Sequence, residues 1–322
     1  MADHADYDGD IFIYRGGRAP QHVTHVRIDN SVDEIEEDAF DGCENLVQVD
    51  THDGIRKIGK KAFYRCTSLR RINIKSAVEI DVLAFNQCLN LESVEFGDRL
   101  EAIGDGAFDR CKSLNHLKLP SIIAIEKFAF SESNLTDVEL SEGLETIGKW
   151  AFLNCERLQR IAIPLKRDLL VLDGCLKYSQ FDYCRQLTTI DIVGGIHETV
   201  ASLHMESWRT GMTAEIKQIN QVLPNTPANE KTAVIRQWMH SVIDKMDRYK
   251  AEHYRYVKEG ITLLELAVWK TQELGEKEEY AAEGRKKKAR VDAESYRRNK
   301  RITCGADTVI KSVRVCGDFH GG

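Results

Sequence analysis

The sequence predicts an α/β solenoid of 22–23-residue repeats with short strands on its concave face, followed by an all-α helical hairpin or coiled-coil extension. Three observations carry this prediction. An Ala-Phe pair recurs at a fixed spacing, and a period of this length is typical of solenoids. Each pair is followed by a Leu-x-x-Ile-x-Ile pattern or a relative of it, whose alternation favours a short strand. After Gly194-Gly195 the apolar spacing changes to three and four residues, which favours helices.

The repeat is defined by six Ala-Phe pairs whose phenylalanines lie 22 or 23 residues apart. They are Phe40, Phe63, Phe85, Phe108, Phe130 and Phe152. A Cys follows three residues later in every copy except the fifth, which has Ser133, and a looser copy runs from Phe181 to Cys184. One copy cannot bury its own apolar side, so we expect the copies to stack around a continuous core.

One copy, Ile58–Ile74, shows the motif Ile-Gly-x-x-Ala-Phe-x-x-Cys-x-x-Leu followed by its strand. This motif resembles the BspA-type leucine-rich repeat over roughly residues 30–193. Four further blocks resemble a large uncharacterised family of leucine-rich-repeat proteins in diatoms. They are Ile11–Gly17, Trp208–Met212, Gln221–Thr226 and Tyr249–His253. The resemblance implies the fold and brings no catalytic residues with it.

Four segments are predicted along the chain. Residues 1–28 form an acidic tail and a capping hairpin, which turns near Gly16-Gly17 and covers the open first edge of the solenoid. The leucine-rich-repeat solenoid occupies 29–196, a long α-helical hairpin occupies 197–274, and a basic helix with an irregular tail occupies 275–322. The insertion at 164–180, before the last copy, is either a contact loop or a structural bulge.

The helical hairpin begins with an apolar stripe from Met205 to Leu223. Thr226 suits an N-cap and Pro227 the first helical position, so we expect the second helix from about Ala228 to Leu274. The far half of this helix, 261–269, is strongly apolar and outreaches the first helix. It is covered either by another copy or a partner helix, giving a possible homo-oligomer through helices 228–274, or by a third helix from residues 276–300.

Composition excludes several classes of protein. A net charge of −6 argues against a dedicated nucleic-acid binder. The sequence contains no run of 18 apolar residues, so no membrane span is predicted. The acidic start lacks the basic-then-apolar pattern of a signal peptide, so we expect an intracellular protein, cytoplasmic or nuclear. Most of the nine Cys recur at one repeat position, which favours a buried ladder of reduced thiols. No metal site or cofactor is predicted, since no Cys-x-x-Cys pair exists.

The residues on either side of the central apolar residue of each strand point outward together, so stacked copies present two polar columns. We predict that this concave face binds an unknown protein partner through its charge pattern. An ordinary solvated face is the alternative. The candidate binding residues are His25, Arg27, Arg71, Asn73, Glu95, His116, Lys118, Asp137, Glu139 and Arg160.

Two basic clusters near the end resemble a bipartite nuclear-import signal. Their residues are Arg285, Lys286, Lys287, Lys288, Arg290, Arg297, Arg298, Lys300 and Arg301. Interleaved acidic residues leave two alternatives open, contact with an acidic partner and an ordinary charged helix.

The sequence contains none of the common catalytic motifs. Phosphate-binding glycine loops, Gly-x-Ser-x-Gly and His-Glu-x-x-His are absent, and the neighbourhood of His116, Asp137 and Arg160 lacks a nucleophile. We therefore predict no enzyme but a non-catalytic interaction scaffold. The alternative is a structural protein that self-assembles through its C-terminal helices.

Overall fold

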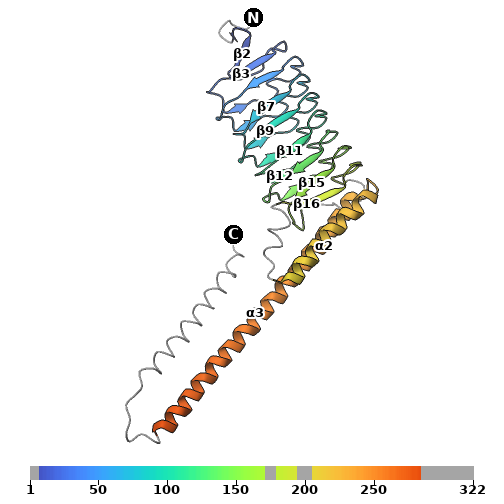
Figure 1. The fold of residues 1–322 in the computed structure, drawn as a ribbon. Coiled ribbons are helices and arrows are strands. Elements are labelled where there is room, and N and C mark those ends of the chain that lie inside the picture. The colour runs from blue at the N-terminus through green and yellow to red at the C-terminus, as the bar shows by residue number, and fades with distance from the viewer. Residues whose placement is uncertain (1–6, 171–178, 194–204, 284–322) are drawn as a thin grey trace. The chain divides into compact units, whose positions relative to one another are not determined.

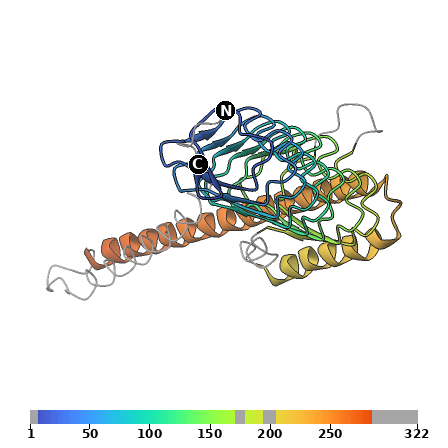
Figure 2. The same ribbon diagram turned by 90° about the horizontal axis from the view of Figure 1, so that it is seen from above.

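The computed structural model describes residues 7–170, 179–193 and 205–283, with side chains up to residue 274. The chain divides into two compact units, Met1–His253 and Tyr254–Gly322. The first unit contains the solenoid, the first helix and the beginning of the second helix. Figure 1 shows successive strands stacked side by side along the solenoid, and Figure 2 shows its turns overlaid on one another.

The longer strands form two parallel sheets along one side of the solenoid (Figure 1). The first sheet contains β2 (Ile11–Tyr14), β3 (His25–Ile28), β5 (Gln48–Asp50), β7 (Arg71–Ile74) and β9 (Ser93–Phe96). The second contains β11 (His116–Lys118), β13 (Asp137–Glu139), β15 (Arg160–Ile163) and β16 (Thr189–Ile192). Exposed and buried residues alternate along β3 and β7. The predicted solenoid of parallel strands is confirmed.

A further parallel sheet, which we did not predict, runs along another side of the solenoid. Its two-residue strands are β4 (Glu34–Ile35), β6 (Lys57–Ile58), β8 (Glu79–Ile80), β10 (Ala102–Ile103), β12 (Ala124–Ile125) and β14 (Thr146–Ile147). The glycine after β6 is required by close packing, because a Cβ at Gly59 would lie 2.6 Å from the Ile35 carbonyl oxygen. The isoleucines recur at the repeat period, and this was the signal in the sequence for the sheet of two-residue strands.

The core is a stack of phenylalanine rings with a ladder of thiols beside it. Rings from Phe40 to Phe181 follow one another at centroid separations of 5.0–5.6 Å, and all seven are fully buried. From Cys66 onward, each described thiol donates a hydrogen bond to the phenylalanine carbonyl of a preceding turn, as Cys66 Sγ does to Phe40 O at 3.1 Å. Cys43, in the first copy, donates to the Pro20 carbonyl instead. Ser133 makes the equivalent bond to Phe108 O at 3.0 Å, so its hydroxyl substitutes for a thiol in this ladder.

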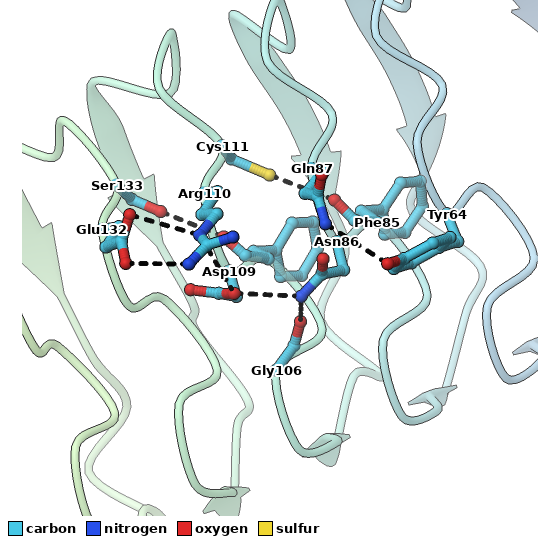
Figure 3. A network of polar contacts seen from close by, with 11 residues as sticks. Tyr64, Phe85, Asn86, Gln87, Gly106, Asp109, Arg110, Cys111, Glu132 and Ser133 are labelled. Atoms are coloured by element: carbon cyan, nitrogen blue, oxygen red, sulfur yellow. Dashed lines mark hydrogen bonds and ion pairs between the residues drawn. The ribbon is translucent and has the colours of Figure 1, made fainter. Parts of the chain in front are cut away.

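Polar side chains hold the turns that follow Phe85 and Phe108 (Figure 3). Asn86 Nδ2 donates to the Gly106 carbonyl at 3.3 Å and to Asp109 Oδ2 at 3.1 Å. Arg110 bridges onward to Glu132, with Nε 3.2 Å from the carboxylate. Burial raises the pKa of the Asp109 carboxyl despite the hydrogen bonds it accepts from Ser131 and Asn86. This network ties three successive turns together along the edge of the solenoid.

The N-terminal hairpin predicted over residues 11–28 is wrong. β2 pairs with β3 in parallel, because the chain from Arg15 to Thr24 makes an irregular turn of the solenoid instead of reversing at Gly16-Gly17. The hairpin lies earlier, where β1 (Tyr7–Asp8) pairs antiparallel with β2 around Gly9, whose φ is +64°. Tyr14 covers the first phenylalanine at a centroid separation of 4.9 Å from Phe40.

Among the residues that the structure describes, two α-helices follow the solenoid, α2 (Glu206–Val222) and α3 (Lys231–Glu283). The short 3-10 helix η2 (Leu223–Asn225) joins them. The predicted helix start is wrong by about three residues. Pro227 lies in a turn and its carbonyl accepts from Glu230 N at 2.9 Å, while the Thr226 hydroxyl donates back to Val222 O at 3.0 Å.

The second helix also ends beyond its predicted limit, at Glu283 rather than Leu274. Residues 276–283 therefore continue α3 and do not begin a separate third helix. The remainder of that predicted helix lies outside the described residues. Within the part of the chain that the structure describes, no helix combines the length and hydropathy required to cross a membrane.

α2 packs antiparallel against the first part of α3. The Trp208 ring stacks on Tyr249 at 5.2 Å, and Trp238 Nε1 donates to the Glu215 carbonyl at 3.2 Å. Gly211 permits the close approach, because a Cβ there would lie 3.0 Å from the Tyr249 hydroxyl. The hairpin prediction is therefore confirmed for these residues.

The helices close the open end of the solenoid by imitating the backbone of a missing turn. The Asn220 amide accepts from Ile190 N at 2.9 Å and donates to Ile190 O at 3.2 Å, as a neighbouring strand would. Thr232 Oγ1 accepts from Phe181 N at 3.0 Å. The buried Lys231 ammonium donates to the carbonyls of Arg185, at 2.9 Å, and Leu187, at 2.5 Å. The last turn thus obtains from side chains the hydrogen bonds that a further repeat would provide.

The described start of the insertion, 164–170, joins the solenoid to α3. Arg167 forms an ion pair with Asp244 at 2.7 Å, and its carbonyl lies 2.8 Å from His240 Nε2. Leu170 continues the short-strand sheet by bridging to Ile147. The described residues of the insertion therefore have a structural role.

Candidate functional site

The candidate site is the outer surface of the long strands, which we call the strand face. It consists of the outward side chains of β3, β5, β7, β9, β11, β13, β15 and β16, and it is the surface predicted to be concave. Register pairs place the ten predicted residues in two columns, with His25 beside Gln48, Arg71 beside Ser93, and Asp137 beside Arg160. The columns are interrupted between β9 and β11, which belong to different sheets.

Most charges on this face are paired within the protein. Arg160 lies between two carboxylates, with Nη1 3.1 Å from Asp137 Oδ1 and Nε 2.6 Å from Asp191 Oδ2. Its guanidinium crosses β13, β15 and β16 and is only 37% exposed. Lys118 pairs with Glu139 at 3.0 Å.

Two further predicted residues, on β3 and β9, are paired as well. Arg27 pairs with Asp8 at 3.0 Å, and Glu95 pairs with Lys75 at 2.8 Å. A partner that competed for any of these charges would first have to break an existing ion pair.

Arg71 and His116 differ from the other predicted charges and bases on the face. Neither side chain makes a hydrogen bond or ion pair to any residue that the structure describes, and both are exposed. His116 lies beside Asp137 in the register, but that carboxylate is held by Arg160. Asn73 is oriented locally, since its Oδ1 accepts from Lys75 N at 3.1 Å.

A hollow of about 330 Å³ lies beside Arg71, where two strands separate. β5 and β7 are paired at a single position, Gln48 with Arg71, whereas β7 and β9 are paired along four. Apolar side chains and polar side chains share the wall. The lining residues are Val47, Gln48, Val49, Arg70, Arg71, Ile72, Asn73, Ser93 and Glu95.

The hollow brings together three predicted residues, Arg71, Asn73 and Glu95, with others that sequence reasoning missed. Gln48, Ser93 and Arg70 lie on the same strands or next to them, and the first two occupy the same column as Arg71. The column pattern contained the signal for Gln48 and Ser93, whereas Arg70 precedes β7 and lies outside both columns. Val47, which is 39% exposed, adds an apolar contact.

The chemistry available on this face is recognition. Arg71 offers a planar cation, Asn73 and Ser93 offer polar groups, and Val49 and Ile72 form an apolar floor. The described residues contain no group of three side chains suited to hold a metal ion. The predicted nuclear-import residues, Arg285 to Arg301, lie outside the described residues.

Comparison with known proteins identifies relatives of the repeats. A family model for the BspA type leucine-rich repeat region, with six copies, matches residues 19–81 and 78–205, more than half of the chain. No curated protein matches the chain.

Solved structures of bacterial leucine-rich-repeat proteins are also similar. A leucine-rich cell surface protein from Faecalibacterium prausnitzii is 29% identical, with a TM-score of 0.43 over 53% of this chain and 55% of that one. The Treponema pallidum (T. pallidum) leucine-rich-repeat protein is 27% identical, with a TM-score of 0.38 over 56% and 72% of the two chains. A leucine-rich-repeat protein from Bacteroides ovatus is 22% identical, with a TM-score of 0.32 over 58% and 60%. The chain spans about half the length of the first of these proteins.

Proposed function

We propose that this chain, which belongs to the BspA-type leucine-rich-repeat family, is a non-catalytic scaffold that binds a protein partner on its strand face. Proteins built from this repeat are generally protein-interaction scaffolds and typically have no catalytic activity. The observation that carries the proposal is the hollow beside Arg71, where a cation that pairs with none of the described residues adjoins apolar side chains. Solenoids commonly bind through such extended surfaces. The partner would occupy the β5–β9 part of the face.

The ion pairs reduce the number of predicted residues that are available to bind a partner. Arg160 and Asp137 satisfy each other, so we now assign them to holding β13, β15 and β16 in register rather than to a partner. Arg71 remains the central binding residue of the proposal, and His116 marks its far limit.

End-to-end assembly of the solenoid is disfavoured by both of its ends. The first edge carries the two-residue strand β1, and short edge strands resist further pairing. The last edge is occupied by Asn220, Lys231 and Thr232. A self-assembling protein would therefore have to use its helices and not its repeats.

A specific observation supports the helices as a second candidate surface. The far part of α3 exposes large apolar side chains, with exposed fractions of 52–67%: Leu263, Leu264, Leu266, Trp269 and Leu274. Self-association through this part would give a particle of twice 36.6 kDa. Light scattering on the purified chain tests this, and a Leu264→Lys variant that leaves a multimer unchanged would count against it.

Photocrosslinking from within the hollow tests the first candidate. The full-length chain would carry a photoreactive phenylalanine analogue at Ser93, and crosslinks would be formed in a lysate of the native cells. The same analogue at Lys112, an exposed residue outside the strand face, is the matched control. We expect an adduct from position 93 that Arg71→Glu removes and that position 112 does not form. Equal adducts from both positions would refute binding on this face.

We propose further that the protein acts inside the cell. The six described cysteines are free and buried, as the reduced ladder requires. The basic residues 285–301 would direct a nuclear location if they act as an import signal.

A further inference from the structure

The strand face contains two arginines in the same column position, and they have opposite surroundings. Arg160 of β15 has Asp137 as its register neighbour on the preceding strand and contacts Asp191 on the next. Arg71 of β7 has Gln48 in the place of Asp137. The residue in the place of Asp191 is Glu95, which is held by Lys75 at 2.8 Å. An arginine is therefore enclosed by carboxylates at one site, whereas at the other it pairs with no carboxylate of the described residues.

The space for the missing carboxylate exists. The hollow of about 330 Å³ includes both Gln48 and Arg71, and it lies where β5 separates from β7. The nearest acidic side chain on β5, Asp50, accepts a hydrogen bond from Gln48 Nε2 at 2.8 Å. Arg70, the second cation of the hollow, reaches Glu92 only at 3.9 Å. The hollow is thus bordered by Arg71, which pairs with no carboxylate of the described residues, and by Arg70, whose ion pair with Glu92 is long.

We propose that the hollow binds a carboxylate of an acidic peptide segment, which takes the place relative to Arg71 that Asp137 takes relative to Arg160. The inference rests on the proposed function and specifies the chemistry of the partner. At the Arg160 site, Nη1 lies 3.1 and 3.3 Å from the two Asp137 oxygens, which defines the geometry that the ligand would reproduce. Guanidinium–carboxylate pairs of this kind are the strong, directional hydrogen bonds of protein recognition.

The floor of the hollow further restricts the ligand. Val47, Val49 and Ile72 provide apolar contacts next to the arginines. A carboxylate flanked by apolar side chains fits this wall better than a run of acidic residues. The ligand class is therefore a short segment with one acidic residue between apolar ones.

Three peptides separate the possible sources of the carboxylate. Acetyl-Val-Glu-Val-amide carries it on a side chain, acetyl-Val-Val carries it at the chain end, and acetyl-Val-Gln-Val-amide is the uncharged match. Each is titrated to about 10 mM into the isotope-labelled full-length chain while the backbone amide signals of Arg71, Asn73 and Ser93 are followed by NMR. We expect acetyl-Val-Glu-Val-amide to bind about tenfold more tightly than the glutamine peptide and more tightly than acetyl-Val-Val.

Two variants identify the place of binding. Gln48→Glu supplies a carboxylate from the protein itself, so Arg71 becomes satisfied and the peptide shifts should be lost. Arg71→Met should also remove them, whereas Lys112→Met should leave them unchanged. Matched thermal melts show whether each variant is folded. If Gln48→Glu is not folded, Arg71→Met still decides whether the peptide binds in the hollow.

The outcomes separate this inference from the proposed function. If no peptide shifts the signals, or if all three bind equally, the carboxylate inference is overturned. Should the Ser93 crosslink still depend on Arg71 in that case, a partner binds the strand face by other chemistry. Should both experiments fail, the strand face is a solvated surface.

Discussion

The cap at the end of the solenoid yields a prediction whose magnitude follows from named hydrogen bonds. Asn220→Ala removes the donor and the acceptor that satisfy the carbonyl and the amide of Ile190, a residue that is fully buried. Each buried backbone group left without a partner costs about 1–3 kcal/mol, so the loss for two groups is about 2–6 kcal/mol. Alanine returns about 0.5 kcal/mol through its higher helix propensity. We expect the free energy of unfolding to fall by about 2–5 kcal/mol.

Urea denaturation followed by circular dichroism measures this change. Gln218→Ala, on the same helix but exposed, is the matched control and should change stability by less than about 0.5 kcal/mol. Hydrogen exchange gives a local readout, because the Ile190 amide should exchange faster in Asn220→Ala than in the natural chain. If Asn220→Ala is as stable as the control and the Ile190 amide remains protected, Asn220 does not act as a substitute strand.

Three further predictions concern the core. Cys111→Ala removes the donor to the Phe85 carbonyl, whereas Cys111→Ser keeps a donor there, as Ser133 does naturally in its own turn. We expect Cys111→Ala to lower the free energy of unfolding by about 1–3 kcal/mol more than Cys111→Ser. Equal losses in denaturant titration would contradict the hydrogen-bond role. Burial raises the pKa of the six described thiols, to about 11 for Cys43 and about 12 for Cys155. In the unfolded chain the thiols ionise near pH 8.5, so the stabilising effect of keeping them protonated in the core is complete below about pH 8.5. Above that pH the free energy of unfolding falls by about 1.4 kcal/mol per pH unit for each thiol, until the pKa of the folded thiol is reached. Cys111→Ser should reduce this slope by the contribution of one thiol, measured by urea denaturation at several pH values. Phe108→Ala opens the middle of the ring stack and should cost about 3–5 kcal/mol in urea denaturation, whereas a loss below about 1 kcal/mol would show that the stack tolerates a cavity.

The sequence was sufficient to predict the features that recur. Seven phenylalanines and their thiols repeat at one position each, so the core and the register of the strand face follow from spacing alone. Strand pairing then confirmed neighbours such as Gln48 and Arg71, or Asp137 and Arg160. Period-based reasoning succeeds here because a one-residue slip would move every apolar side chain to the wrong face.

The features that occur only once in the chain were predicted poorly, because contacts distant in sequence decide which groups the backbone bonds to. The two glycines at 16–17 suggested a hairpin, but ten residues between Tyr14 and His25 are enough for the chain to go round the solenoid and pair in parallel. Pro227 fits the first turn of a helix, yet α3 begins at Lys231, where Lys231 and Thr232 bond to the last turn. Tertiary hydrogen bonds outweighed the local preference in this case.

The candidate site shows what a sequence column can reveal when it is read together with its neighbours. Arg71 and Arg160 have the same residue type and the same phase, so a list of exposed charges ranks them equally. The residues on the preceding and the following strand distinguish the two arginines. For Arg160 these neighbours are Asp137 and Asp191, whereas for Arg71 they are Gln48 and Glu95. The remaining step, that Lys75 draws Glu95 away, required the structure because Lys75 lies outside both columns. On a repeat surface, where most charges are balanced by the adjacent turn, binding is best sought where the balancing residue is missing.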